Sequence, residues 1–377
     1  MIPVFRPYAN EEEKKAVERV IDSRWWGLGP ETEQFEKEFT KYLGAEYGIA
    51  TNSGTAALHM ALWSLGLKKK EEVIVPSFTF VSSVHAVKYV GGNPIFADID
   101  RETLTLDPED VEAKITENTR AVVVVHYGGH SARMDEIRKI AREHNLKVIE
   151  DCAHAAGALF KGEKLGTIGD ISAFSFHAVK NIATGDGGMI VFKDKELLER
   201  MRSFRWVGIT KSTWDRYAPP SGKDRGVNSS AYDVEELGMK YHMNDIQAAI
   251  ARVQLKRLDR MNKVRKELVN EYRERLEGST DVKLLKEQPW ATSSNHLFVI
   301  LSKKRDIIMR HLNSAQIATS VHYIPVHKFS LYSSENGNTH LPVTEEAGNS
   351  VLTLPLFPDL KVEEVSFISN KIREAVL

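Results

Sequence analysis

Short apolar runs alternate with amphipathic stretches between about residues 45 and 195. The apolar runs are rich in Val, Ile and Phe, which is typical of buried β-strands. In chain order they are GIAT, EVIVP, PIFADI, AVVVVHY, KVIED, ISAFSF and GMIVF. Because helical stretches separate several of these runs, the pattern predicts an α/β fold with a mostly parallel sheet covered by helices.

Helical periodicity marks the stretches between the strands. In TAALHMALWSLGL, Leu58, Ala61, Leu62 and Leu65 recur at i, i+3, i+4 and i+7, which predicts one apolar helix face. RMDEIRKIAREHN predicts a helix between AVVVVHY and KVIED, so these three segments form a strand, helix, strand unit. In such a unit Asp151 stands at the carboxyl end of its strand, the edge where ligands bind in open α/β sheets.

The last third of the chain has a different pattern. Residues 245–278 show one continuous helical periodicity, and we expect this helix to bridge two domains. HLFVILS, DIIMRHLNS, ATSVHYIPV and a helix from Val362 follow, which indicates a smaller α+β domain. We therefore expect a large domain over residues 1–250 and a small C-terminal domain over residues 251–377. Residues 211–235 are rich in Gly, Pro and Ser, which predicts a long loop suited to be a substrate lid.

Composition and charge narrow the class of protein. The chain has 377 residues, of which 42% are hydrophobic and 27% charged, as is ordinary for a soluble globular protein. Its 51 Lys and Arg nearly balance its 52 Asp and Glu, so no overall field draws nucleic acid or an acidic membrane surface. The single cysteine, Cys152, excludes an internal disulfide and a multi-cysteine zinc site and fits a reducing compartment.

The chain start also bears on location. It has no apolar core of signal-peptide length, and no window approaches the roughly 18 apolar residues that span a bilayer. We expect a cytoplasmic protein that is neither exported nor membrane-embedded, and we assign no metal site.

Two charged residues near predicted strand ends suit pyridoxal 5'-phosphate. This cofactor needs an amine for a Schiff base, an anion at its pyridine nitrogen, donors for its phosphate and a flat surface against its ring. Lys180 follows an apolar run and enters a glycine-rich turn; desolvation lowers the pKa of such a lysine and increases its free amine. Asp151 can pair with the pyridine nitrogen and keep it protonated.

Other residues offer the remaining contacts. The segment NSGTAAL supplies backbone N–H groups and the Thr55 hydroxyl at a helix start, where the helix dipole favours an anion by about 0.3–1 kcal/mol. Ser175 offers a second hydroxyl to a phosphate, Phe80 a ring for stacking, and His154 a partner for the phenolic oxygen of the cofactor. Each residue alone also has an ordinary structural explanation, such as a cap or a core aromatic. Their order on successive strand ends indicates a cofactor site.

Longer blocks carry a family resemblance over nearly the whole chain. They include WWGLGPETEQFEKEF, TNSGTAAL, VIVPSFTF, IEDCAHAAGALFKG, GTIGDISAFSFHAVKNIATGDGGMIVF, YHMNDIQAAIARVQL and VHYIPVHKFSLY. With these blocks the chain resembles the sugar aminotransferases of the DegT/DnrJ/EryC1/StrS family. The resemblance implies the type I fold of pyridoxal-phosphate transferases, similar to aspartate aminotransferase. That fold has a large domain with a mostly parallel mixed sheet, plus a smaller C-terminal α+β domain.

The resemblance also implies roles for individual residues. Lys180 is the catalytic residue that holds the cofactor covalently, and Asp151 binds the pyridine nitrogen. The remaining cofactor contacts that it implies are Gly54, Thr55 and Ser175 at the phosphate, His154 at the ring oxygen and Phe80 stacked on the ring. Because the lysine is present, the resemblance favours an aminotransferase over the related sugar dehydratase, which has histidine at this position.

Substrate-side residues come from two further segments. Lys240 stands in ELGMKYHMND where the family often has Asn, at a position associated with the cofactor phosphate across a dimer interface. A cation there can serve that phosphate or a substrate diphosphate. In VHYIPVHK, His322, Tyr323 and His327 match the family's substrate-side segment, although histidines in a loop are also often plain surface. Further cations for a diphosphate, without ranking, are Lys211, Arg216, Lys223 and Arg225.

The implied reaction has two stages in a homodimer. L-glutamate gives its amine to the cofactor, which then aminates a keto sugar carried by a nucleotide, for amino-sugar, lipopolysaccharide or glycan synthesis. A 4-keto sugar is favoured, and a 3-keto sugar is the alternative. A different pyridoxal-phosphate reaction, such as dehydration or decarboxylation, and a non-catalytic regulator that keeps the scaffold are the competing interpretations.

Overall fold

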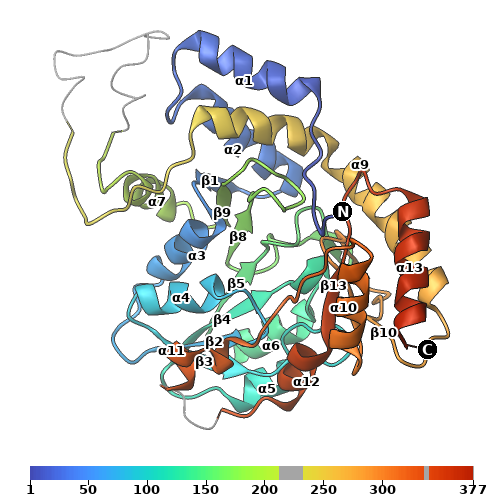
Figure 1. Cartoon of the computed structure of the whole chain (residues 1–377). Coiled ribbons are helices and arrows are strands. Elements are labelled where there is room, and N and C mark those ends of the chain that lie inside the picture. Colours follow the sequence, from blue (N-terminus) through green and yellow to red (C-terminus); the bar gives the residue numbers. More distant parts are fainter. Residues whose placement is uncertain (212–231, 335–338, 377) are drawn as a thin grey trace.

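A seven-stranded sheet forms the centre of the molecule. The computed structural model describes residues 1–211, 232–334 and 339–376 (Figure 1). The strands are β1 (Tyr47–Thr51), β2 (Glu72–Pro76), β3 (Asn93–Ala97), β4 (Thr119–Val125), β5 (Lys147–Asp151), β8 (Ile171–Ser175) and β9 (Gly188–Phe192). Their order is β1-β9-β8-β5-β4-β2-β3, and only β9 runs antiparallel to its neighbours. The predicted α/β class with a mostly parallel mixed sheet is confirmed.

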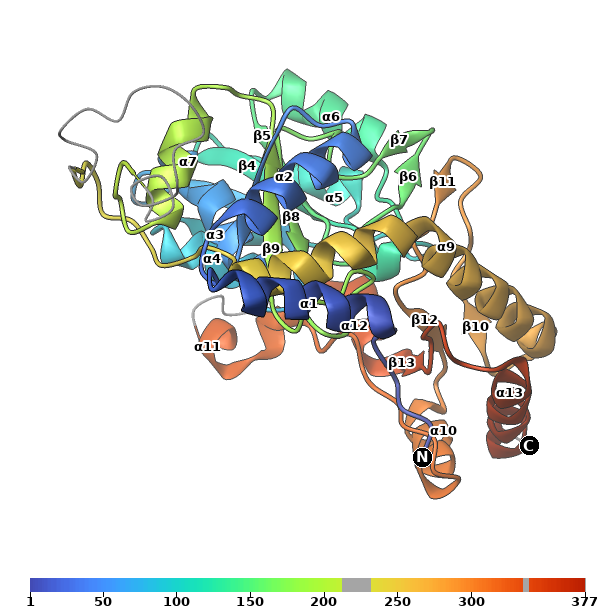
Figure 2. The same cartoon turned by 90° about the horizontal axis from the view of Figure 1, so that it is seen from above.

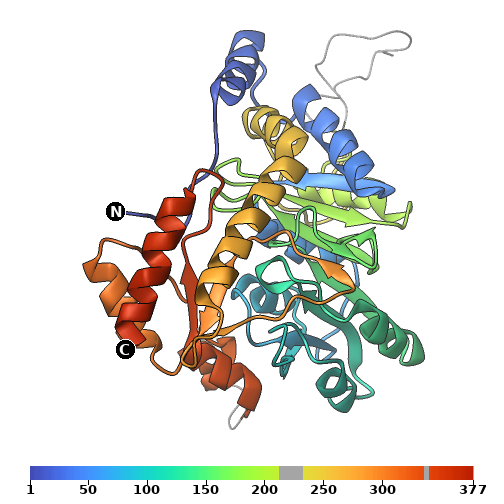
Figure 3. The same cartoon turned by 90° about the vertical axis from the view of Figure 1, so that its right-hand side faces the viewer.

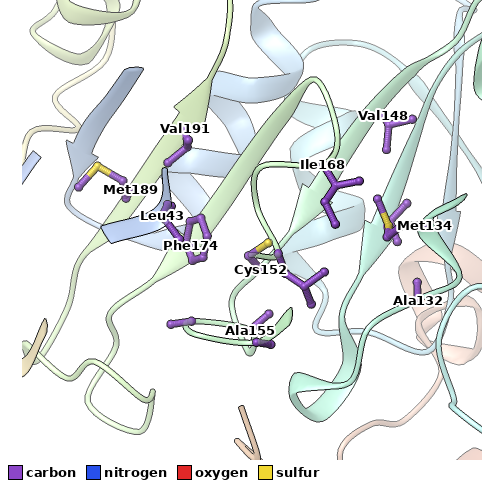
Figure 4. Packing of buried hydrophobic residues seen from close by; sticks show 14 of the residues in the cluster. Leu43, Ala132, Met134, Val148, Cys152, Ala155, Ile168, Phe174, Met189 and Val191 are labelled. Carbon is purple, nitrogen blue, oxygen red and sulfur yellow. The ribbon is translucent and has the colours of Figure 1, made fainter. Parts of the chain in front are cut away.

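Helices cover both faces of this sheet (Figures 1 and 2). The helices on one face are α2 (Pro30–Leu43), α5 (Pro108–Ala113), α6 (Met134–Glu143) and α9 (Asp245–Leu276). Those on the other face are α3 (Gly54–Trp63), α4 (Ser82–Tyr89) and α7 (Leu197–Arg205). Figure 4 shows the core between the sheet and the first group of helices, in which Cys152 is buried among Ile168, Ala155 and other apolar side chains. The result is a helix–sheet–helix sandwich that leaves the strand ends free for ligands.

Helix α3 is more deeply buried than its pattern suggested. Every residue from Ala56 to Leu62 is buried, including His59, so the helix has no solvated face over this stretch. The reason is its position, because α3 contacts β8 and β9 on one side and α4 and α7 on others. The i, i+3, i+4 periodicity identified the helix correctly but described only one of its buried faces.

Two N-terminal helices were not predicted from the sequence. They are α1 (Glu11–Ser23) and α2, and both have readable start signals. Asn10 accepts the backbone N–H of Glu12, and the Glu13 carboxylate accepts the N–H of Asn10, which is a capping box. Pro30 occupies the first turn of α2, where its missing N–H is not needed.

A second, antiparallel sheet lies beyond α9 (Figure 3). It consists of β10 (Lys283–Leu284), β12 (Phe298–Leu301) and β13 (Val351–Leu354), and α10 (Arg305–Ser314) and α13 (Val362–Val376) pack with it. The latter half of α9 belongs to this core through Tyr272, which stacks on Phe298. Helix α9 runs unbroken through residue 250, and Ile2 pairs with Ile317. The division of the chain at residue 250 stays a prediction.

Short elements complete the described chain. They are β6 (Leu159–Phe160), β7 (Glu163–Lys164), β11 (Ala291–Thr292), α11 (Ser330–Ser333), α12 (Pro342–Ser350) and the 3-10 turns Tyr127–Gly129 and Val326–Lys328. None of the helices in the described part of the chain combines the length and apolar character that crossing a bilayer requires.

A buried ion pair ties α2, β1 and α7 together. Arg205 donates to Glu36 at 2.5 Å and to the carbonyl of Ala50 at 2.9 Å, and the Ala50 N–H donates to the same Glu36 carboxylate. Both side chains are buried. Each charge therefore depends on the other, since neither has water to replace its partner.

Replacement of Arg205 by alanine should destabilise the protein strongly. The variant leaves Glu36 buried without its cation, which typically costs about 3–5 kcal/mol of unfolding free energy. Arg202→Ala is the matched control, because Arg202 pairs with Glu199 in solvent on the same helix and should cost less than about 1 kcal/mol. Denaturant unfolding of the three proteins measures both values, and equal losses in the two variants would contradict this account.

Candidate active site

A cavity of about 400 Å³ opens at the carboxyl ends of the central strands. All but two of the predicted site residues line it. They are Gly54, Thr55, Phe80, Asp151, His154, Ser175, Lys180, His322 and Tyr323. They come from the ends of β5 and β8, from the starts of α3 and α4, and from the segment that precedes α11. The fold thus brings together side chains up to 269 residues apart in the sequence, from Gly54 to Tyr323.

Asp151 and Lys180 are the two charged groups of opposite sign in this cavity that affect one another. Asp151 ends β5, with Val125 of β4 and Ala173 of β8 as its partners in the sheet. Burial raises the pKa of the Asp151 carboxyl, against the hydrogen bond from Ser83 and the charge of Lys180, which lower it. Burial lowers the pKa of Lys180 to about 8, and the charge of Asp151 opposes this. Among the described residues, the Lys180 amine has no hydrogen-bond or ion-pair partner.

The start of α3 forms a pocket for an anion. Ser53 caps the helix by accepting the N–H of Ala56 at 3.1 Å, and the Thr55 hydroxyl lies 2.8 Å from that of Ser82. A Cβ atom on Gly54 would lie 2.8 Å from the Cβ of Ser175, so only glycine lets the helix approach β8 this closely. The free N–H groups at the helix start, with the nearby hydroxyls, suit a phosphate.

Two histidines in the cavity are neutral. His154 Nδ1 accepts the N–H of Gly128 at 3.2 Å, which assigns the ring proton to Nε2, 3.0 Å from the Tyr323 hydroxyl. Burial holds the pKa of His154 well below its usual range. His322 Nδ1 lies 2.8 Å from the Thr353 hydroxyl, and burial lowers its pKa to about 4. Both side chains therefore act at neutral pH through hydrogen bonds and not through charge.

Phe80 differs from the other lining residues in its exposure. Its side chain is 59% exposed, and its ring centroid lies 6.2 Å from that of Tyr323. A large apolar ring held in solvent beside a cavity costs free energy unless something covers it. Its position is consistent with an aromatic surface for a flat ligand.

Lys240 and His327 do not line the cavity. The Lys240 amine lies 3.5 Å from the centroid of the Trp206 ring and faces solvent. His327 is 4% exposed, with Nδ1 2.6 Å from the Ser77 hydroxyl and Nε2 3.4 Å from Glu345. The ring of His327 therefore contacts Ser77, directly after β2. Thr79 and Phe80, which follow Ser77 in the chain, line the cavity, but His327 itself does not.

Of the four cations predicted between residues 211 and 235, only Lys211 belongs to the described residues. Arg216, Lys223 and Arg225, with most of the predicted lid, lie outside the described residues. Lys211 is exposed and lines a different hollow, beside α2 and α7.

Sequence reasoning missed the hydroxyl residues around Phe80. Thr79, Ser82 and Ser83 all line the cavity, and Ser83 donates to Asp151 Oδ2 at 2.7 Å. In SFTFVSS the sequence analysis assigns a role to Phe80 alone. The available signal was a pair of hydroxyl residues four positions apart, directly after a strand end, where one helical turn places them side by side.

A second buried acid lies on the opposite face of β5. The Glu150 carboxylate accepts His126 Nε2 at 3.0 Å and three backbone N–H groups of residues 166–169. His126 Nδ1 accepts the N–H of Ala132. The two side chains lie close to Cys152, but their ligand atoms are already hydrogen-bonded. This cluster therefore fixes the strand end that carries Asp151.

The reactivity of Lys180 gives a direct test of this geometry. In protein freed of any cofactor, reductive methylation of Lys180 should show a midpoint near pH 8, against about 10.4 for an ordinary lysine. Asp151→Asn removes the negative charge that favours the ammonium, so the midpoint should fall further. Peptide mapping by mass spectrometry over a pH series reads both, with exposed lysines of the same digest as reference. An unchanged midpoint in the variant would show that the two groups are not coupled.

Comparison with known proteins gives consistent matches. A family model described as the DegT/DnrJ/EryC1/StrS aminotransferase family matches residues 7–373. The spore coat polysaccharide biosynthesis protein SpsC of Bacillus subtilis is 37% identical over 384 residues, covering 100% of this chain and 97% of SpsC.

Solved structures agree with the sequence matches. S. venezuelae DesV, solved in complex with a ketimine intermediate, is 36% identical with a TM-score of 0.88, covering 97% of this chain and 94% of DesV. The putative sugar aminotransferase Spr1654 from Streptococcus pneumoniae, in its PMP form, is 28% identical with a TM-score of 0.93, covering 100% and 99%. Spr1654 has also been solved in a PLP form.

Proposed function

We propose, on the premise that the chain belongs to the DegT/DnrJ/EryC1/StrS aminotransferase family, that it transfers an amino group from L-glutamate to a 4-keto sugar carried by a nucleoside diphosphate. Like its solved relatives, the chain is a pyridoxal-phosphate-dependent sugar aminotransferase and not a non-catalytic regulator. The observation that carries the proposal is the shared cavity of Lys180 and Asp151, an amine and a carboxylate that perturb each other's pKa.

The residues present fit pyridoxal phosphate. When bound, the cofactor supplies an aldehyde that accepts amines and a ring that withdraws electrons from the reacting carbon. The phosphate is assigned to the start of α3, where Gly54 leaves room against Ser175 and Thr55 adds a hydroxyl. The ring nitrogen is assigned to Asp151, since a buried carboxylate needs a cationic partner.

Side chains on either side of the ring complete the proposed binding. Phe80 is assigned to the face of the ring, and His154 to its phenolic oxygen. The single N–H of neutral His154 donates to Tyr323, so the hydroxyl proton of Tyr323 is left to donate to that oxygen, and His154 would act there through Tyr323.

Lys180 is assigned the proton transfers. With a pKa of about 8, about a tenth of the Lys180 side chains carry a free amine at pH 7, far more than for an ordinary lysine with a pKa of about 10.4, so Nζ is a competent nucleophile for an aldehyde. With the cofactor bound, Lys180 would hold it covalently, and as a free amine its Nζ would carry the proton to and from the α-carbon of the amino donor.

Binding of the sugar is assigned to His322 and Tyr323 at the cavity wall. His327 stays a proposed substrate-side residue, through its hold on Ser77. Lys240 is proposed to serve the cofactor phosphate or a substrate diphosphate of a partner subunit in a homodimer. Its exposed amine, outside the cavity of its own chain, supports that assignment.

The sugar class rests on resemblance. The segments VHYIPVHK and LPLFPDL resemble those of relatives that aminate 4-keto sugars, and SpsC is named for polysaccharide biosynthesis. We propose a role in amino-sugar supply for lipopolysaccharide or another glycan. A cytoplasmic location is proposed because the single, buried cysteine fits a reducing compartment.

Two stages of one assay test the proposal. L-glutamate alone should bleach the long-wavelength absorbance of the purified holoenzyme, and a panel of nucleotide-linked 4-keto and 3-keto sugars should then yield an amino sugar by mass spectrometry. Lys180→Ala should lower turnover by about 10³-fold or more, because proton transfer loses its base. Lys139→Ala, an exposed lysine on α6, is the matched control.

The outcomes separate the alternatives. Amination of 3-keto sugars only would replace the 4-keto assignment, whereas decarboxylation or dehydration without an amino product would overturn the transfer reaction. Near-normal turnover of Lys180→Ala would remove its catalytic role.

A further inference from the structure

Two adjacent serines at the start of α4 connect the two ends of the cavity. Ser82 lies 2.8 Å from the Thr55 hydroxyl, at the helix start assigned to the phosphate. Ser83 donates to Asp151 Oδ2 at 2.7 Å, at the end assigned to the ring nitrogen. Successive side chains on a helix point about 100° apart, which is why two neighbours can serve separate sites.

We propose that Ser83, oriented by Thr79, is a positioning residue that holds the Asp151 carboxylate charged and aimed at the ring nitrogen of the cofactor. The proposal rests on the function proposed above. It adds two residues that neither the sequence patterns nor the family resemblance assigned to the site.

The direction of the hydrogen bonds follows from counting protons. Two groups that only accept lie near the Ser83 hydroxyl: Asp151 Oδ2 at 2.7 Å and the Phe80 carbonyl oxygen at 3.2 Å. The carboxylate is nearer and charged, so the single hydroxyl proton of Ser83 goes to Asp151 Oδ2. Ser83 Oγ also lies 2.9 Å from Thr79 Oγ1. Because Ser83 donates its only hydroxyl proton to Asp151, its oxygen must accept the hydrogen bond from Thr79. The proton of Thr79 therefore points at Ser83, and a chain of two hydroxyls ends on the carboxylate.

The two hydroxyl groups that form this hydrogen-bond chain are buried. Ser83 is 1% exposed and Thr79 2%, so water does not compete for their hydrogen bonds. The other oxygen of Asp151, Oδ1, accepts the N–H of Ala153 at 3.1 Å. Each carboxylate oxygen thus has one donor that fixes its orientation, and a lone pair remains for the cofactor.

The electrostatic effect has a definite sign. Burial raises the pKa of Asp151, and the Ser83 hydrogen bond is the first of the contacts that lower it. The titratable groups that interact electrostatically with Asp151 in the described chain are Lys180 and Tyr323 in the cavity, and His126 and Cys152 on the opposite face of β5. The charge of Lys180 favours the carboxylate, whereas the buried Tyr323 and Cys152 stay protonated and add no charge. His126 donates from Nε2 to Glu150 and accepts at Nδ1, so its proton is already engaged away from Asp151. Loss of Ser83 should therefore let the proton of the ring nitrogen move toward Asp151.

The protonation of the ring nitrogen is the measurement. The cofactor-free protein is reconstituted with pyridoxal phosphate labelled with ¹⁵N in the ring, and the nitrogen chemical shift is followed against pH. In Ser83→Ala the midpoint for loss of the nitrogen proton should fall by about one pH unit, the size of one hydrogen bond to a charged group. Ser83→Thr, which keeps the hydroxyl, should restore it.

Two further variants keep the test decisive. Thr79→Val keeps the shape of the side chain but removes the donor to Ser83, so it should move the midpoint the same way by less. Ser82→Ala is the matched neighbour and should leave the nitrogen signal where it is, because Ser82 contacts Thr55 and not Asp151.

The outcomes separate the positioning role of Ser83 from the assignment of Asp151 to the ring nitrogen. If Asp151→Asn moves the nitrogen signal but Ser83→Ala and Thr79→Val do not, the positioning role is wrong and the assignment of Asp151 stands. If Asp151→Asn also leaves the signal unchanged, the assignment of Asp151 fails first. An equal shift in Ser82→Ala and Ser83→Ala would indicate a general loosening of α4 and would also overturn the proposal.

Discussion

The site depends on one electrostatic constraint, the burial of an unneutralised carboxylate and an unpaired amine in the same cavity. Asp151 is 5% exposed, and burial pushes its pKa up while it pushes that of Lys180 down. Each group stabilises the charged form of the other, but neither is held by a direct ion pair in the described chain. A ligand that carries a cationic nitrogen at one end and an aldehyde at the other resolves both conditions.

The sheet explains why these groups meet. Parallel strands β4, β5 and β8 end at the same edge, so a residue that ends β5 and a turn that follows β8 must face a common space. The buried pair of Glu150 and His126 fixes the other face of β5. Because alternate residues of a strand point to opposite faces, a structural acid and a cavity-lining acid can occupy adjacent positions without interfering.

Much of this arrangement was predictable from the sequence. The seven strands of the central sheet, the helices α3, α6 and α9, and the position of Asp151 at the end of β5 followed from hydrophobic periodicity, whereas α4, α5 and α7 were not predicted individually. The helices before residue 45 were missed, although Asn10 with Glu13 and the proline at residue 30 were sufficient signals. In these cases the physical information is local, because caps and periodicity involve residues a few positions apart.

The remaining features depend on contacts between distant segments. Ser83 and Asp151 are 68 residues apart, and no local pattern in either segment predicts the hydrogen bond between them. The segment VHYIPVHK predicts that His327 contacts the substrate. In the folded chain its ring instead lies against Ser77, 250 residues earlier. Lys240 lies outside the cavity of its own chain because its segment runs beside Trp206. Side-chain direction of this kind is decided by tertiary packing, which periodicity does not encode.

A crystal structure of the protein reconstituted with pyridoxal phosphate tests the central claim most directly. The account predicts continuous electron density from Lys180 Nζ to the cofactor, with the Asp151 carboxylate within hydrogen-bond distance of the ring nitrogen at the opposite end. Density joining the cofactor to a different lysine, or a ring nitrogen facing away from Asp151, would contradict it.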